Sequence, residues 1–280
     1  MAGVPIPPGP AGVDPLAAPL TYPGTPPWQP AVLVTDGAVL ILQPRDDAPL
    51  GEWLLQADEN TATGSSPVRP GEAAPREPLL DQYLRDAGGL PAESLVPVLA
   101  VGSNASPAQV QRKLAIAGLP TRVPITAVRV RGLAVGVSAH VSRPGYLPAT
   151  PVPAAAAESD LWVVWLDPAA LVAVDATEPN YERIRLPARY PVRLTTGQPV
   201  TGCRVYRSRH GYLVNEAGEP RRLTDQPTLI TALLAELPAL SSLAGMSAQE
   251  WIEQTRDPAV RAAIREAFRS AHLVRQVDEF

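Results

Sequence analysis

The chain has 280 residues, 45% of them apolar, and a formal net charge of −4. This length and composition predict a folded core and exclude a chain that is disordered throughout. The acidic balance argues against a nucleic-acid binder, and a lone cysteine, Cys203, excludes an internal disulfide framework. The three histidines lack the spacing of metal ligands, so we expect neither a metal site nor another cofactor.

The expected location follows from two further features. No apolar run is long enough to span a bilayer, and the N-terminal MAGVPIPPGP lacks the basic start and apolar stretch of a signal peptide. We therefore expect a cytoplasmic protein without membrane contacts. Among the 24 basic residues a single one is lysine, Lys113. Such a bias is typical of coding preference, and we assign it no function.

Residues 1–30 contain ten prolines, which fix the backbone angle and restrict the preceding residue. The segment is therefore predicted to be extended and irregular. Two interpretations stay open. It is either a disordered tail or an arm that wraps the domain with Leu20, Tyr22 and Trp28 as anchors.

Residues 31–92 are predicted to be an N-terminal extension with short strands and a helix. The pattern in 31–43 indicates a hairpin around Thr35-Asp36-Gly37. The remaining elements follow in chain order: a strand in 51–56, a loop over 57–78 and a helix over 78–86.

Residues 93–215 are predicted to form the core. The expected elements, in chain order, are a strand at 96–101, a helix from Ser106 to 117, strand pairing over 122–139, a proline- and alanine-rich loop over 143–158, a buried strand at 161–166, a short helix over 169–176, strand patterning over 181–194 and a strand at 201–207. Within them, Ser138 of GVSAH lacks the context of a nucleophile elbow and is interpreted as a strand residue.

Residues 216–280 are predicted to be a helical C-terminal region. The apolar side of its last helices would dock either on the main domain or on a second subunit, which would make a homodimer. The order of elements predicts an α+β fold, in which helices surround a curled mixed or antiparallel sheet or a small barrel, with a helical tail.

The first candidate site is Val101-Gly102-Ser103-Asn104. A strand that runs into a glycine-containing turn and a helix start presents free backbone N–H groups. Such groups bind a carboxylate, a phosphate or a developing oxyanion. The alternative is an ordinary strand-helix turn.

The second candidate is Glu178, which follows a short helix and precedes a proline. A carboxylate shielded by Trp162, Trp165 and Tyr181 would suit a general base. The alternative is a solvated loop acid paired with Arg183 or Arg185.

Taken together, the two segments resemble the γ-glutamylcyclotransferase-like superfamily. The residues that carry the resemblance are AVGSNAS at 100–106, the strand LWVVWLD at 161–167 and LVAVDATEPNYERIRL at 171–186. The resemblance covers about residues 96–210. It implies that Glu178 is the catalytic acid/base, that residues 101–104 hold the substrate and that Tyr181 lines the pocket.

The implied reaction cyclises a γ-glutamyl group to 5-oxoproline and releases an amine, or is a related acyl transfer at the same site. The substrate is a small molecule of γ-glutamyl type, and no cofactor is needed. The sequence departs from the family pattern where a tyrosine is replaced by Val101 and a glycine by Pro179. These departures keep a second hypothesis open, a non-catalytic binding or interaction protein that retains the fold.

Overall fold

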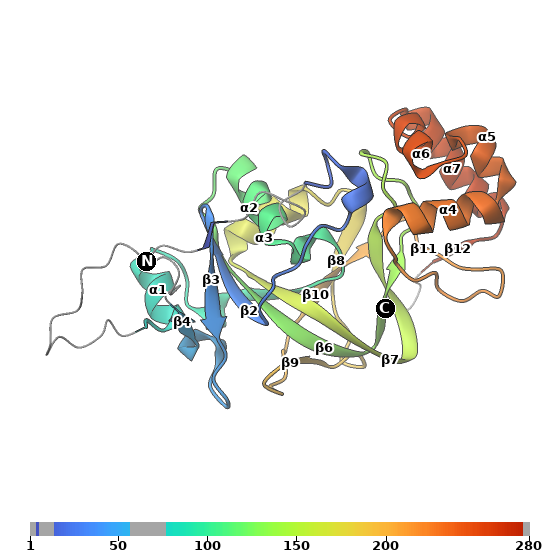
Figure 1. The fold of residues 1–280 in the computed structure, drawn as a ribbon. Helices are drawn as coiled ribbons and strands as arrows, with labels where there is room; N and C mark the ends of the chain where they lie inside the picture. Colours follow the sequence, from blue (N-terminus) through green and yellow to red (C-terminus); the bar gives the residue numbers. More distant parts are fainter. Residues whose placement is uncertain (1–3, 6–13, 57–76, 277–280) are drawn as a thin grey trace, which may run out of the picture.

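The fold is built around one large β-sheet (Figure 1). The computed structural model describes residues 4–5, 14–56 and 77–276, so the loop predicted over 57–78 lies almost wholly outside the described residues. Ten strands of the described residues form the sheet. Eight of them lie in the spatial order β1 (Val4–Pro5), β3 (Ala38–Gln43), β2 (Ala31–Thr35), β6 (Arg122–Val137), β7 (Ala149–Leu166), β5 (Val96–Ala100), β10 (Arg204–Ser208) and β8 (Tyr181–Arg185), while β4 (Leu54–Gln56) pairs with β3 and β9 (Val192–Leu194) pairs with β6.

The sheet is mixed. β10 runs parallel to β5, with Arg204 opposite Val98, whereas β5 pairs antiparallel with β7 and β7 antiparallel with β6. Helices lie around this curled sheet, and a group of helices follows it at the C-terminal end (Figure 1). The predicted α+β fold class is confirmed.

The longest strand corrects one prediction. β7 begins at Ala149, so most of the predicted loop over 143–158 is strand paired with β6. The composition was misleading because Pro151 and Pro153 cannot donate backbone hydrogen bonds. Val135, opposite Pro151, directs its carbonyl to the amide of Leu223 and not to β7. The two residues therefore form a non-hydrogen-bonded pair, in which the proline ring costs the ladder no bond.

The strand patterning over 181–194 is interrupted. β8 ends at Arg185 and pairs with β10, whereas β9 begins at Val192 and pairs with β6. The predicted strand patterning over 181–194 was therefore wrong for the segment between β8 and β9. The chain there passes from the strand that pairs with β10 to the strand that pairs with β6.

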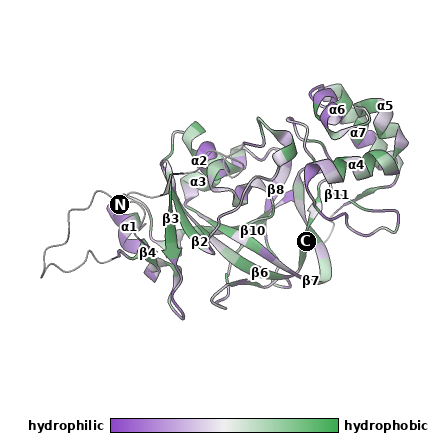
Figure 2. Ribbon diagram, viewed as in Figure 1, coloured by the Kyte–Doolittle hydropathy of each residue, from purple (hydrophilic) through white to green (hydrophobic). Residues whose placement is uncertain are grey.

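Two helices cover the face of the sheet that carries the candidate site. They are α2 (Pro107–Ile116) and α3 (Pro168–Ala176), each with proline in its first turn. The Asp167 side chain caps α3 by accepting a bond from the Ala170 amide at 2.8 Å. Both helices pack in one apolar cluster with residues of β2, β5 and β6, and Figure 2 shows β2 as a largely hydrophobic strand. The start of α2 and the end of α3 lie at the same end of the sheet, where Asn104 contacts Glu178.

The N-terminal hairpin extends the same sheet. β2 and β3 pair as predicted, and β2 also pairs with β6. Helix α1 (Leu80–Asp86) packs in a second apolar cluster with Trp53 and Leu55. Residues 31–56 thus continue the sheet of the core, while the boundaries at residues 30, 92 and 215 stay predictions.

Residues 14–30 favour the arm over the disordered tail for this part of the chain. Tyr22 is buried at 5% exposure, and Leu20 packs against a third apolar cluster. Trp28 is 50% exposed, so it is not the anchor that the sequence suggested.

The C-terminal helices form that third cluster with the end of the β6–β7 hairpin. They are α4 (Gln226–Glu236), α5 (Pro238–Ala244), α6 (Ala248–Gln254) and α7 (Pro258–Ser270), followed by β12 (Val274–Arg275), which pairs with β11 (Tyr212–Leu213). Their apolar sides therefore dock on the main domain, and a homodimer through these helices stays a prediction. Within the described ranges no single helix has the length and hydropathy to cross a bilayer; α4 and α5, bent by 118°, meet that criterion only as a pair.

Candidate functional site

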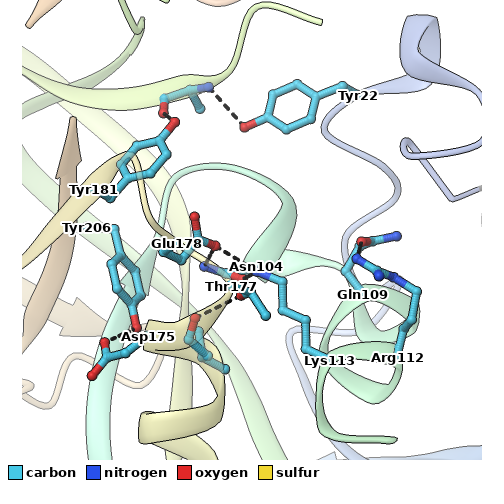
Figure 3. A network of polar contacts seen from close by, with 12 residues as sticks. Tyr22, Asn104, Gln109, Arg112, Lys113, Asp175, Thr177, Glu178, Tyr181 and Tyr206 are labelled. Atoms are coloured by element: carbon cyan, nitrogen blue, oxygen red, sulfur yellow. Dashed lines mark hydrogen bonds and ion pairs between the residues drawn. The ribbon is translucent and has the colours of Figure 1, made fainter. Parts of the chain in front are cut away.

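Glu178 lies in the turn between α3 and β8. Its backbone amide donates to the carbonyl of Asp175 at 3.0 Å, and its own carbonyl accepts from the amide of Tyr181 at 3.0 Å. Pro179 follows at once, so the helix cannot continue. The turn directs the Glu178 side chain toward the loop after β5 (Figure 3).

The loop after β5 meets this carboxylate. The backbone closes tightly there, with the Ala105 amide donating to the Gly102 carbonyl at 3.0 Å. The side-chain amide of Asn104 donates to Oε1 of Glu178 at 3.2 Å. Two segments that the sequence singled out separately, 74 residues apart, are therefore in direct contact.

Lys113 completes the contact. Its Nζ donates to Oε1 of Glu178 at 2.7 Å and to Oδ1 of Asn104 at 2.6 Å, and its side chain is only 5% exposed (Figure 3). The alternative of a solvated loop acid paired with Arg183 or Arg185 was wrong, since Glu178 is paired with Lys113 and Arg183 binds Asp175. Lys113 was not predicted as a site residue, although its rarity in the sequence could have drawn attention to it.

Asp175, Arg183 and Tyr206 form a second group of polar contacts near Glu178. Arg183 binds Asp175 at 2.8 and 2.9 Å through two nitrogens, and the Tyr206 hydroxyl donates to the same carboxylate at 2.7 Å. The Arg183 hydrogen bonds lower the pKa of Asp175, with a further contribution from Tyr206. This group fixes the end of α3 and orients Tyr206, which reaches the cavity beside Glu178.

The predicted site residues share one small cavity of about 30 Å³. The predicted catalytic and substrate-binding residues, 101–104, Glu178 and Tyr181, line it, together with residues of β5, β7, β10 and the N-terminal arm, whereas Trp162 does not. The lining residues are Tyr22, Leu99, Ala100, Val101, Gly102, Ser103, Asn104, Ala149, Glu178, Tyr181 and Tyr206. The predicted Trp165 lies elsewhere, since its indole donates to Thr126 at 2.9 Å in the cluster on the other face.

Tyr22 enters this cavity from the N-terminal arm. Its hydroxyl oxygen accepts a hydrogen bond from the Ala149 amide at 2.9 Å, and its ring stacks on Tyr146 with centroids 4.1 Å apart. A Cβ added at Gly102 would overlap the Tyr22 hydroxyl, so glycine is needed there for close approach. Burial raises the pKa of Tyr22, while the backbone N–H groups of Ala149 and Ser103 oppose this rise.

The opposite wall of the cavity comes from the β6–β7 connection. The hydroxyl of Tyr181 donates to the Ala149 carbonyl at 2.8 Å, and burial raises the pKa of Tyr181. Burial, together with the charge of Glu178, raises the pKa of Tyr146 to about 12. Burial also raises the pKa of Tyr206, so Tyr22, Tyr181 and Tyr206 at the cavity, and Tyr146 beside it, are neutral hydrogen-bonding groups at physiological pH.

The C-terminal helices hold this connection in place. Gln226 of α4 both accepts from the Leu147 amide at 2.8 Å and donates to the Leu147 carbonyl at 3.0 Å. The indole of Trp251 on α6 donates to the Gly145 carbonyl at 2.9 Å. No pattern in the sequence indicated this support, because it joins side chains to backbone groups about 80 to 106 residues away.

A buried polar cluster adjoins Tyr181 on the far side from Glu178. The Ser138 hydroxyl lies 2.6 Å from Nδ1 of His140 and 2.6 Å from the Ser208 hydroxyl. Burial lowers the pKa of His140 to about 3, and the neighbouring His210 adds to this effect. Ser138 is fully buried, so the structure agrees with its interpretation as a structural residue.

The arrangement offers one carboxylate and a set of hydrogen-bond donors. Both bonds to Glu178 use Oε1, and within the described part of the chain Oε2 accepts no hydrogen bond, so it is left for a ligand. Among the described residues no three histidine, cysteine, aspartate or glutamate side chains are grouped to hold a metal ion. The chemistry that this set supports is proton transfer at Glu178 next to backbone amides that accommodate a carbonyl oxygen.

Comparisons with known proteins found solved structures of low similarity to this chain. No family model matches the chain, and no curated protein matches it. Among solved structures it is similar to the human protein loc79017, described as uncharacterized (20% identity, 41% of this chain and 67% of that one, TM-score 0.32). It is also similar to At5g39720.1 from Arabidopsis thaliana (16%, 54% and 89%, 0.33) and to a gamma-glutamyl cyclotransferase (14%, 61% and 99%, 0.34). At these values we draw no functional conclusion from them.

Proposed function

We propose that the cavity is the closed form of an active site that cyclises a γ-glutamyl group to 5-oxoproline, or catalyses a related acyl transfer, with Glu178 as acid/base. The observation that carries the proposal is the contact between Glu178 and Asn104 beside the 101–104 backbone. The resemblance of these two segments to γ-glutamylcyclotransferase-like sequences supports it. Tyr181, the remaining predicted site residue, lines the same cavity.

The proposed step needs one proton carrier. The α-amine of the γ-glutamyl group attacks its own γ-carbonyl carbon, a new C–N bond closes the five-membered ring, and the γ-amide C–N bond breaks. Glu178 takes the proton that the attacking amine loses and returns it to the leaving amine. Because the nucleophile belongs to the substrate, proximity supplies much of the acceleration.

The charged neighbours have separate roles in this proposal. Lys113 and Asn104 bind the same oxygen of Glu178 and so fix the carboxylate, which leaves Oε2 to exchange the proton. The Ala149 backbone amide, which binds the Tyr22 oxygen at the cavity, would stabilise negative charge on the carbonyl oxygen once Tyr22 leaves. Lys113 is therefore a positioning residue.

A second candidate function is a non-catalytic binding protein that retains the fold. The observation in its favour is the small cavity of about 30 Å³, which is filled by Tyr22 and is too small for a γ-glutamyl group. The replacement of the motif tyrosine by Val101 also favours a non-catalytic binding protein.

The test is release of 5-oxoproline from γ-glutamyl amino acids, dipeptides and amines, measured by mass spectrometry on the purified full-length protein. We expect Glu178→Gln to lower the rate at least 100-fold, since it removes the proton carrier. Glu182→Gln is the matched control, because Glu182 lies four residues away in an exposed ion pair with Arg207. Equal rates for wild type and Glu178→Gln on every substrate would favour the non-catalytic protein.

A further inference from the structure

A segment of the N-terminal arm, the strap of residues 14–24, is fixed at both ends. At one end the Asp14 carboxylate accepts from the Gln109 side chain at 3.0 Å and lies 3.3 Å from Nε of Arg112, both on α2. At the other end Tyr22 enters the cavity (Figure 3). Between them the turn Pro19–Thr21 lies against α4 and α6. The strap therefore spans from the helix that carries Lys113 to the C-terminal helices.

The oxygen of Tyr22 occupies a defined polar position. It accepts from the Ala149 amide at 2.9 Å, and it lies against the loop after β5, because a Cβ added at Gly102 would overlap it. A backbone N–H group in such a position fits the oxygen of a carbonyl or carboxylate as well as that of a phenol. A ligand oxygen bound there and the Tyr22 hydroxyl would therefore exclude each other.

The ring of Tyr22 removes the rest of the space. It stacks on Tyr146, and its hydroxyl lies where a side chain at Gly102 would begin. The remaining cavity of about 30 Å³ has room for roughly one or two water molecules. A ligand with a carbon chain enters only if Tyr22 leaves.

The contacts that hold the strap suit a reversible element. The Asp14 and Arg112 side chains are 32% and 31% exposed, so their ion pair is partly solvated. With the Gln109 hydrogen bond to the same carboxylate, it holds the strap to α2, and water can replace both contacts when the strap opens. Leu16, near the start of the strap, is 45% exposed. Tyr22 and Pro15 are the buried residues of the strap, and Leu20 packs on the C-terminal helices.

We propose that the strap is an autoinhibitory element, in which Tyr22 occupies the position of the ligand's carbonyl or carboxylate oxygen between the 102–104 loop and the Ala149 amide. The inference deepens the proposed function and rests on it for the identity of the ligand. Release of the strap opens the site, and the apparent affinity for the ligand is lowered by the fraction of molecules in which the strap is closed.

Opening is measured without reference to activity by hydrogen–deuterium exchange of full-length protein. We expect Asp14→Ala and Tyr22→Ala each to speed exchange at 102–104 and 146–149 at least tenfold, since the Ala149 amide loses its partner. Trp28→Ala is the matched control, because Trp28 is a half-exposed aromatic residue close to the strap. Asp14→Ala keeps Tyr22 and lies outside the cavity, so it separates release of the strap from loss of a buried ring.

Binding of 5-oxoproline, measured by calorimetry, and release of 5-oxoproline from γ-glutamyl substrates are then compared. We expect at least tenfold tighter binding and faster turnover in both strap variants, which corresponds to a strap closed in about 90% or more of the molecules. A loss of turnover in Tyr22→Ala together with unchanged exchange in Asp14→Ala would overturn the inference, because Tyr22 would then be a fixed wall of the site. Faster exchange without binding or turnover would support the strap as a cover and overturn the proposed function.

Discussion

Nζ of Lys113 lies 2.7 Å from Oε1 of Glu178, and both side chains are largely buried. The two residues come from α2 and from the turn after α3, so their contact ties the two halves of the candidate site together. An arginine in this place would present a larger planar group with a different set of donors. This difference gives a physical reason for a lysine at the one position where the chain uses it.

Removal of that charge should destabilise the fold. Lys113→Met keeps the length of the side chain but leaves the Glu178 carboxylate without its cation, which we expect to cost about 3 kcal/mol in the free energy of unfolding. The measurement is urea denaturation of Lys113→Met, Glu178→Gln and the double variant. We expect the double variant to be more stable than the sum of the single losses predicts, whereas simple additivity would show that the pair is not coupled.

A side chain at Gly102 should act through Tyr22. Gly102→Ala places a Cβ against the Tyr22 hydroxyl, and overpacking of this kind costs about 1 to 3 kcal/mol. In a Tyr22→Ala background the nearest atom to the added methyl group is Cβ of Ala149, at 3.1 Å, so the loss should be smaller. Thermal denaturation of the four proteins checks this, and an equal loss in both backgrounds would place Tyr22 elsewhere.

The support from the C-terminal helices should be specific to one connection. Gln226→Ala removes both bonds to Leu147 and leaves two buried backbone groups unpaired, at a cost of about 2 to 4 kcal/mol. Hydrogen exchange should rise at 145–149, next to the cavity. Gln249→Ala serves as control, since Gln249 donates to Glu253, one helical turn away, at the surface; the same effect from both variants would contradict a specific role.

His140 should make the fold sensitive to acid. Its folded pKa is about 3, below the value of 6.5 that applies when it is exposed in the unfolded chain. The contribution of neutral, buried His140 to the free energy of unfolding is therefore fully present above about pH 6.5. It is lost as the pH falls toward 3, at up to about 1.4 kcal/mol per pH unit. Urea denaturation at several pH values should show a shallower slope for His140→Gln over this range, and parallel curves would mean that another group is responsible.

The sequence predicted the parts of the site that are local patterns. The turn at 101–104 and the helix end before Glu178 each follow from strand, glycine and proline signals within a few residues. Lys113 and Ala149 were missed because their role depends on partners 65 and 127 residues away. Tyr22 was named as an anchor, but its place in the cavity could not follow from its neighbours in the sequence.

The fold class could also be predicted from local patterns, namely the order of strands and helices along the chain. The errors lie where pairing between strands overrides the preference of the local composition. β7 contains Pro151 and Pro153, which locally favour a loop. Their non-hydrogen-bonded pairing with β6 makes strand structure compatible with both, and this arrangement depends on the register with Leu133 and Val135. The sequence pattern of a single strand does not determine its register with the neighbouring strand.

The central claim is that Glu178, the 101–104 loop and Ala149 form one ligand site beneath Tyr22. The most direct measurement is a titration of nitrogen-15-labelled Tyr22→Ala protein with 5-oxoproline, followed by NMR. We predict that the amide signals of Ser103, Asn104 and Ala149 shift together along one binding curve, and that Glu178→Gln in the same background weakens this binding. Saturable shifts elsewhere with these three signals unchanged would contradict the claim.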